Sequence, residues 1–193
     1  MSLENTRNII LNVANNLFSK FGFHKTSMDE IAKIARKAKG SLYYHFASKE
    51  DLYKEVVSNE IVKFKSEMSL ILDKENIRAS EKIKLILVKR MEVINEAANY
   101  HDTLKADFFE HYDFIDDLRN EHDNWEKSIL KNLIIQGVES GEFMENLNID
   151  ELLEMYLMVV KGLEIPFFLQ DKYEKHQPSF EKLIEVFIKG LKT

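Results

Sequence analysis

The sequence predicts an all-α protein in which a group of short N-terminal helices precedes a larger helical domain. Only two prolines and six glycines interrupt its 193 residues. Long stretches rich in Leu, Ile, Lys, Glu and Asn favour helix over strand, and no apolar–polar alternation of period two marks a strand. Hydrophobic residues make up 45% of the chain, so we expect one or two domains with a sizeable buried core.

The first predicted helix ends near residue 21. Gly22 follows it, and glycine commonly supplies the left-handed backbone that terminates a helix. Up to that point apolar residues recur at the spacing of a single helix face: Ile10, Val13, Ala14, Leu17 and Phe21.

Cap signals place the next three helices. The sequence SMDE at 27–30 has the serine-to-glutamate spacing of a capping box, so a short helix begins near Ser27. A third short helix is predicted over residues 38–45. The sequence SKED at 48–51 is another cap with acidic residues in the first turn, and it starts a long fourth helix.

The rest of the chain is predicted to be helical near 80–98, 102–112, 114–139, 149–172 and 178–192. Gly141 marks the end of the third of these helices, and Asn148 caps the next with Glu151. Pro178 is placed in the first turn of the last helix. Pro166 should kink or end its helix near residue 165.

Charge is distributed unevenly along the chain. The net charge is −6, but residues 1–55 hold nine Lys or Arg against six Asp or Glu, and residues 56–193 hold eighteen against twenty-seven. Within 20–49 the balance is seven basic residues to two acidic ones. A compact N-terminal segment can therefore face phosphates although the whole chain is acidic.

Composition excludes several classes of protein. The chain has no cysteine, which removes disulfides, thiol nucleophiles and thiolate metal sites and fits a reducing compartment. No leader precedes the first helical pattern, and charges and a proline interrupt the longest apolar run at 152–169. We expect a cytoplasmic protein with no membrane partner and no cofactor.

The segment KAKGSLYYHFASKEDLY at 37–53 carries the functional signal. Two short helices joined by a tight turn have the form of a helix-turn-helix, whose second helix enters the major groove of DNA. Basic, small and aromatic polar residues on that helix suit phosphates, sugars and base edges. The competing interpretation, in which Tyr43, Tyr44 and His45 pack inside a small domain, explains the basic surroundings less well.

Residues 9–57 resemble the DNA-binding domain of the TetR/AcrR family of transcriptional regulators. The resemblance rests on LFSKFGF, TSMDEIA, KGSLYYHF and SKEDLY in order, and on GVESGEF and KGLE farther along. It implies a DNA-binding domain at 1–48, with the connecting helix continuing to about 57, and a helical effector-binding and dimerisation domain at 49–193. It also implies a homodimer paired through its last two helices, with a ligand cavity among the middle helices.

The resemblance assigns DNA contacts residue by residue, with Leu42 and Phe46 in the core of the small domain. The implied contacts are Ser27, Lys39, Gly40, Ser41, Tyr43, Tyr44, His45 and Lys49. The turn departs from the family pattern, because ARKA at 35–38 stands where Ala-Gly-Val-Ser is usual. The easiest left-handed residue is lost, and Ala38 cannot cap the recognition helix as serine would.

An aromatic cluster in the middle of the chain suggests the effector site. Aromatic residues at helical spacing are more often core than ligand lining, yet together they predict a largely apolar cavity and a hydrophobic or aromatic effector. Phe114 belongs to this cluster. The candidate effector-binding residues are Met91, Phe108, Phe109, Tyr112 and Trp125.

The run at 152–169 is apolar on nearly all sides, which favours burial both inside the subunit and against a partner. With the last helix it can build a four-helix dimer interface. The candidate interface residues are Leu152, Tyr156, Val159, Leu163, Phe180, Leu183, Ile184 and Phe187.

Other site chemistries are less well supported. His101, His111 and His122 with Asp107 and Glu126 could ligate a metal, but solvent-exposed polar residues explain them better and no metal is predicted. The adjacent carboxylates Asp116 and Asp117 diverge on a helix and do not converge on one reacting atom, so we do not expect an enzyme.

The sequence therefore predicts a ligand-responsive transcriptional regulator, a repressor that binds a palindromic double-stranded DNA operator as a homodimer. A small, largely hydrophobic effector would release it from DNA. The alternative is a DNA-binding regulator whose C-terminal domain binds a protein partner instead of a small molecule.

Overall fold

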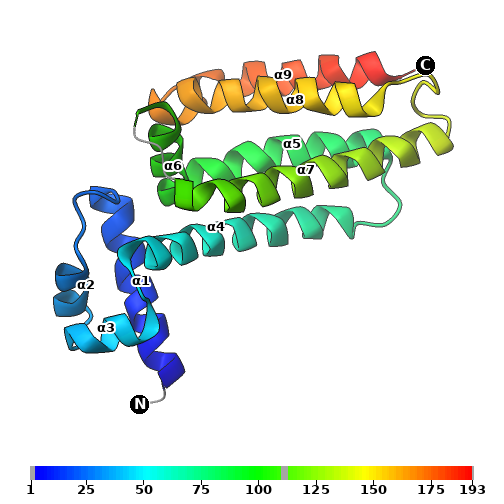
Figure 1. Ribbon diagram of the computed structural model, residues 1–193. Coiled ribbons are helices and arrows are strands. Elements are labelled where there is room, and N and C mark those ends of the chain that lie inside the picture. Colours follow the sequence, from blue (N-terminus) through cyan, green and yellow to red (C-terminus); the bar gives the residue numbers. More distant parts are fainter. Residues whose placement is uncertain (1–2, 110–112, 193) are drawn as a thin grey trace. The chain divides into compact units, whose positions relative to one another are not determined.

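The computed structural model describes residues 3–109 and 113–192, with all their side chains except those of residues 3 and 105–109. Within these ranges the chain is helical and forms no strand, apart from an isolated bridge between Phe143 and Lys192 (Figure 1). The α-helices are α1 (Leu3–Phe21), α2 (Met28–Ile34), α3 (Lys39–His45), α4 (Lys49–Leu72), α5 (Ala79–Glu96), α6 (Ala98–Phe109), α7 (Asp113–Glu139), α8 (Ile149–Glu164) and α9 (Tyr173–Leu191). A short π-helix, η1 (Ile165–Leu169), continues α8. The predicted all-α fold class is confirmed.

The chain divides into two compact units. The first comprises residues 1–62 and 97–118, and the second comprises residues 63–96 and 119–193. The first unit thus contains α1 to α3, the beginning of α4, α6 and the first turns of α7. The functional division predicted at residues 48 and 49 stays a prediction.

A dense apolar core holds the first unit together. Leu42 and Phe46 of the helix-turn-helix are 0% and 3% exposed, as their predicted core role requires. The core combines one face of α1, both short helices, the start of α4 and one turn of α7, and its most deeply buried members include Ile10, Phe18, Ile31, Leu52 and Val57. The core therefore fixes α3 by one face only, and the opposite face remains available.

Local signals set the helix ends of this unit as predicted. Gly22 ends α1 in the left-handed region with φ +80°. The Ser27 hydroxyl accepts a hydrogen bond from the Glu30 amide at 3.2 Å, and the Ser48 hydroxyl accepts one from the Asp51 amide at 2.9 Å. Each cap satisfies an amide that has no partner within its own helix.

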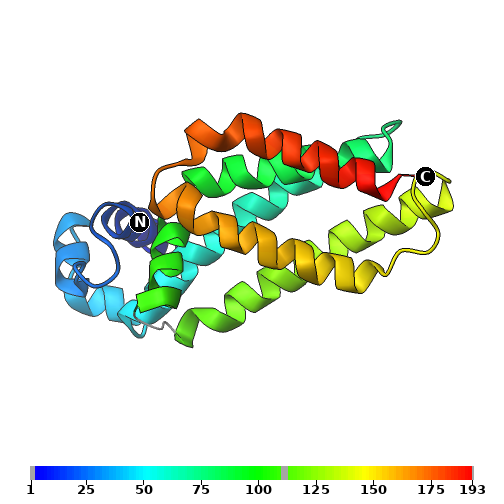
Figure 2. The ribbon, with the colours of Figure 1, turned by 90° about the horizontal axis from the view of Figure 1, so that it is seen from above.

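The second unit is a bundle of long helices. In Figure 1, α8 and α9 cover α5 and α7, and Figure 2 shows α8 and α9 running in opposite directions. Inward-facing residues are almost completely buried, among them Met91 at 0% and Leu153 at 1% exposure. The outer face of α8 and α9 is apolar yet exposed at Met155, Met158, Val159, Leu183 and Val186.

Two predicted helix boundaries are wrong. The last helix begins at Tyr173 instead of near 178, so Pro178 lies inside α9 and not in its first turn. Tyr173 is 7% exposed, and its ring lies 5.8 Å from that of Phe167. This packing starts the helix before Pro178, on its N-terminal side. The helix predicted from 102 starts at Ala98, because the carboxylate of Glu60 caps it there.

The expectation for Pro166 is confirmed. Regular α-helix ends at Glu164, so the helix predicted over 149–172 is shorter than expected, and η1 carries Pro166 near its first turn. A proline removes one amide donor and crowds the preceding turn, which disfavours the α-helical ladder. The rings of Phe167 and Phe180 pack against each other at 5.8 Å and hold this irregular turn in place.

Candidate DNA-binding and effector sites

The helix α3 presents polar and aromatic side chains to solvent. Tyr43 and Tyr44 are 44% and 71% exposed, and Lys39 and Gly40 are exposed as well. A Cβ added at Gly40 would meet nothing within 4 Å, so a second molecule can approach the backbone closely there. Ser41 and His45 are half-buried, and the His45 ring packs edge-on against Tyr44 at 5.1 Å.

Four of the predicted DNA contacts meet in one groove of about 350 Å³, which we call the α3 groove. Ser27 at the start of α2, Lys39 and Tyr43 on α3, and Lys49 at the start of α4 contribute to it. The other lining residues are His24, Lys25, Thr26, Met28 and Asp29. Three lysines and a tyrosine hydroxyl around one groove can bind phosphate oxygens. The contacts themselves stay a prediction.

Two of these lysines are held by other residues of the unit. The Lys39 ammonium lies 2.6 Å from Asp29 Oδ1, and this hydrogen bond and charge raise the pKa of Lys39. The Lys49 ammonium donates to the Phe23 carbonyl at 3.0 Å and sits 4.1 Å from the centre of the Phe23 ring. Lys49 therefore also stabilises the loop between α1 and α2, a role that the sequence did not indicate.

The unusual turn between α2 and α3 closes without glycine. Arg36 takes the left-handed conformation with φ 54°. The Lys37 amide donates to the Ala32 carbonyl at 3.0 Å and the Arg36 amide to the Lys33 carbonyl at 3.2 Å, the two bonds of a Schellman motif. Ala38 makes no side-chain cap for α3, as predicted. The turn is thus held by backbone bonds that do not depend on the residue types of the family pattern.

Polar contacts tie α6 to the rest of the first unit. The Glu60 carboxylate of α4 accepts hydrogen bonds from the amides of Asn99 and Tyr100 at 3.3 and 2.8 Å. Asp102 accepts one from the Phe23 amide at 2.9 Å, directly after the left-handed Gly22. These bonds connect α6 directly to the end of α1 and to α4. Sequence reasoning missed these residues, because their partners lie far away in the chain.

The predicted effector residues do not gather in one unit. Met91 and Trp125 belong to the second unit, where Met91 is fully buried and Trp125 is half-buried. Phe108 and Phe109 lie on α6 in the first unit, and their side chains, like Tyr112, lie outside the described residues. Phe114 packs in the first unit, with its ring 5.4 Å from that of Phe23.

A network of buried charges lies in the second unit, and sequence reasoning missed it. Arg90, Glu126 and Glu164, from α5, α7 and α8, are each 1% exposed. Arg90 Nε donates to Glu126 Oε1 at 2.7 Å, and Arg90 Nη2 donates to Glu164 Oε1 at 2.6 Å. The Tyr156 hydroxyl donates to the same Glu126 oxygen at 2.9 Å. One signal in the sequence could have indicated this network: Glu164 is an acidic residue in the otherwise apolar run at 152–169.

Burial changes the protonation of this network. It lowers the pKa of His122 from 6.5 to about 4, and the nearby Arg90 charge acts in the same direction. Burial also raises the pKa of Glu164, against the opposing effect of Arg90, and raises the pKa of Tyr156. Each shift disfavours the charged form, as expected where solvent is excluded. His122 is therefore neutral at pH 7.

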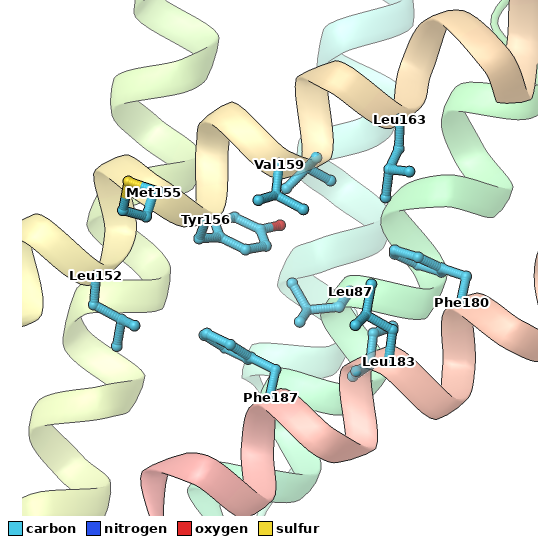
Figure 3. Close-up of a pocket in the computed structure, with 11 residues that line it drawn as sticks. Leu87, Leu152, Met155, Tyr156, Val159, Leu163, Phe180, Leu183 and Phe187 are labelled. Atoms are coloured by element: carbon cyan, nitrogen blue, oxygen red, sulfur yellow. The ribbon is translucent and has the colours of Figure 1, made fainter.

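The predicted dimer residues line a second groove, between α8 and α9 (Figure 3), which we call the α8–α9 groove. Its volume is about 310 Å³. Val159 and Leu183 are half-exposed, Phe180 and Ile184 are 8% and 3% exposed, and Leu87 of α5 forms part of the floor. All eight predicted residues contribute, together with Leu87, Met155 and Val160.

The described part of the chain offers neither a metal site nor a membrane-spanning helix. No group of three or more His, Asp or Glu side chains there is placed to hold a metal ion. Among the same residues, every helix is too short or too polar to cross a membrane.

An all-α chain with an exposed, basic and aromatic second helix in a helix-turn-helix belongs to the class of DNA-binding transcriptional regulators. Residues 10–56 match the family described as bacterial regulatory proteins, tetR family. The chain is 25% identical over 191 residues to the HTH-type transcriptional regulator QacR of Staphylococcus aureus, with 97% of this chain and 98% of that protein covered. The similarity to the tetR family thus covers residues 10–56, and the similarity to a transcriptional regulator covers nearly the whole chain.

Solved structures share the whole fold. A transcriptional regulator of Saccharomonospora viridis in complex with choline superposes with a TM-score of 0.78 at 21% identity, covering 96% of each chain. FadR of Bacillus subtilis in complex with stearoyl-CoA superposes with a TM-score of 0.71 at 22% identity, covering 91% of this chain and 96% of that one. Proteins of this fold therefore include regulators that bind small molecules.

Proposed function

We propose that this protein is a ligand-responsive repressor that binds a palindromic DNA operator as a homodimer and is released by a small, largely hydrophobic effector. Residues 1–48 would read the operator, and residues 49–193 would bind the effector and dimerise. The α3 groove and the exposed face of α3 are the observation that carries the proposal. They combine basic charge, aromatic hydroxyls and an open backbone on one surface.

The DNA contacts follow from this surface. Lys39, Tyr43 and Ser27 border the α3 groove and would bind phosphates, while Tyr44, the most exposed of the aromatic residues on α3, would reach base edges or sugars. Gly40 would let the helix approach the DNA backbone closely. Two such helices in a dimer must match the groove repeat of about 34 Å, so a palindromic site is expected.

The outer face of α8 and α9 supports homodimerisation. Large apolar side chains there are about half-exposed or more, from Leu183 at 49% to Val186 at 67%. A contiguous exposed apolar face on a soluble protein usually marks an interaction surface. A second copy presenting the same two helices would bury this face in a four-helix arrangement.

Effector control would act through a population shift. An effector that binds better to one arrangement of the second unit changes the spacing of the two recognition helices and so the affinity for DNA. Chain continuity offers the route, since α4 and α7 each contribute residues to both units. Glu60 and Asp102 would pass a movement of α6 to α4 and to the end of α1.

Selection of bound duplexes from a random DNA pool at near-physiological salt tests the proposal. Wild type should recover a palindromic consensus, and Tyr43→Ala should not. Val62→Ala is the matched control, because Val62 is 60% exposed but lies on α4, away from α3. A consensus without a palindrome would contradict the dimeric arrangement, and no enrichment by folded wild type would contradict operator recognition.

The protein-partner alternative makes a different prediction for the same apolar face. If α8 and α9 bind another protein, the purified chain should remain monomeric at micromolar concentration with the face uncovered. A dimer that disappears when this face is charged would argue against that alternative.

A further inference from the structure

The buried charges of the second unit do not balance. Among the described residues of this unit, Arg90, His122, Glu126 and Glu164 are the buried side chains that can carry charge. His122 is neutral at pH 7 because burial lowers its pKa to about 4. Two carboxylates thus share one guanidinium in a site closed to solvent. An uncompensated charge in such surroundings is costly, so a proton or another cation must balance it.

An unused acceptor points to where the missing positive group belongs. Glu126 Oε1 accepts hydrogen bonds from Arg90 and Tyr156, whereas the buried Glu126 Oε2 accepts none. A carboxylate can accept several hydrogen bonds, and buried polar atoms are nearly always paired. Glu126 therefore offers a charged acceptor that the described part of the protein leaves unused.

Aromatic side chains lie within one turn of Glu126 along α7. His122 lies one helical turn before Glu126 on α7, and its ring stacks on that of Trp125 at 6.4 Å and 15°. The ring of Phe64 meets His122 edge-on at 4.7 Å. The Lys65 ammonium sits 5.4 Å from the centre of the Trp125 ring, so this ring already makes a cation–π contact within the protein. Trp125 is only half-buried, so part of its side chain is in contact with solvent.

We propose that the effector of this regulator is an organic cation whose charged group pairs with Glu126 and whose apolar part packs against Trp125 and Phe64. The inference rests on the function proposed above and deepens it by assigning a charge to the effector. Two buried carboxylates that share a single guanidinium supply the attraction, and the aromatic rings supply both apolar area and the negative faces that favour cations.

A proton on Glu164 would balance the charge before the effector binds. Burial raises the pKa of Glu164, and the groups around it are Arg90 on α5, Glu126 and the more distant Arg119 on α7, and Tyr156 on α8. A bound cation favours the ionised form of Glu164. Binding should therefore release a proton, and the cation should bind less tightly as the pH falls.

Two molecules of the same shape test whether the effector must be positively charged: the cation phenyltrimethylammonium and the neutral tert-butylbenzene. Trp125 is the only tryptophan of the chain, so its fluorescence reports binding at this position. The cation should change the emission and bind at least about tenfold more tightly than the neutral compound. Equal or tighter binding of tert-butylbenzene, or no binding of the cation, would overturn the inference.

A variant pair locates the charge. Glu126→Gln keeps the shape of the side chain and should abolish the tenfold preference for the cation. Glu121→Gln makes the same change at an exposed position of the same helix and should retain it. An unchanged preference in folded Glu126→Gln would overturn the assignment. If Glu126→Gln does not fold, calorimetry of wild type in two buffers of different ionisation enthalpy decides, because proton release should accompany the cation only.

Operator binding separates this inference from the proposed function. Displacement of the selected operator by the neutral compound as readily as by the cation would leave ligand control standing and refute the charge. Selective binding of the cation at Trp125 without any effect on operator affinity would leave the cation site standing and refute ligand control.

Discussion

Among the described side chains of the first unit the buried ones carry no formal charge, and Lys25, Lys39 and Lys49 border the α3 groove at the surface. In the second unit Arg90, Glu126 and Glu164 are buried, while Met158 and Val186 are 60% and 67% exposed. The described interior of the first unit is thus free of charge, and its lysines are at the surface. The second unit has charged residues in its interior and an apolar outer face on α8 and α9. A bound ligand would complete the interior, and a second copy of the chain would cover the outer face. Removing charges should therefore affect the two units very differently.

The largest effect is expected from Arg90→Met. The substitution leaves Glu126 and Glu164 buried without a counter-charge, and it should lower the free energy of unfolding by about 3–5 kcal/mol. Arg7→Met is the control, since the Arg7–Glu55 pair is far more exposed and should cost less than about 1 kcal/mol. Urea unfolding followed by circular dichroism at pH 7 measures both. Similar losses would mean that burial does not distinguish the two ion pairs.

Low pH should destabilise the second unit through protonation of the buried His122. Its pKa is about 4 in the folded protein and 6.5 in an unfolded chain, so the unfolded state binds the proton first as the pH falls. The stability contribution is complete above pH 6.5 and is lost progressively toward pH 4, by about 3 kcal/mol in total.

The variant His122→Gln isolates this contribution. Its free energy of unfolding should fall less steeply between pH 6.5 and 4 than that of wild type, by about 3 kcal/mol over the interval. Parallel curves would show that His122 is protonated equally in the folded and unfolded states.

Charging the apolar exterior tests the proposed dimer. Val159→Glu places a carboxylate on the outer face of α8 and should yield a monomer whose affinity for a palindromic operator is lower by roughly 100-fold, because two half-sites are no longer linked. Val62→Glu changes an equally exposed valine of α4 and should leave the dimer intact. Analytical ultracentrifugation and operator titration give the two readouts. If the Val159→Glu protein remained dimeric, the dimer interface would have to lie outside the outer face of α8 and α9.

The smallest effect concerns two serine caps of the N-terminal part. Ser27→Ala and Ser48→Ala each remove the acceptor for one helix-terminal amide and should each cost about 1 kcal/mol of stability. Only Ser27 lines the α3 groove, so only Ser27→Ala should also weaken operator binding. Equal operator affinities for the two variants would restrict Ser27 to its capping role.

Some sequence predictions failed where distant residues decided the structure. Pro178 was placed at a helix start because proline suits that position, but packing of Tyr173 on Phe167 begins α9 earlier. Phe114 was grouped with Trp125 by proximity in sequence, yet it packs on Phe23 in the other unit. Proximity along a helix says nothing about which of two cores a side chain enters.

The sequence by itself determined the helical class, the caps at Ser27 and Ser48, the glycine end of α1, and the order of motifs that marks the helix-turn-helix. These features depend on residues within a few positions of one another, so the local sequence is sufficient to predict them. Only the tertiary structure paired Arg90 with Glu126 and Glu164, which lie 36 and 74 residues away, and Asp102 with Phe23, 79 residues away. Such contacts arise when helices pack, because burial makes each charge depend on whichever partner the fold brings beside it.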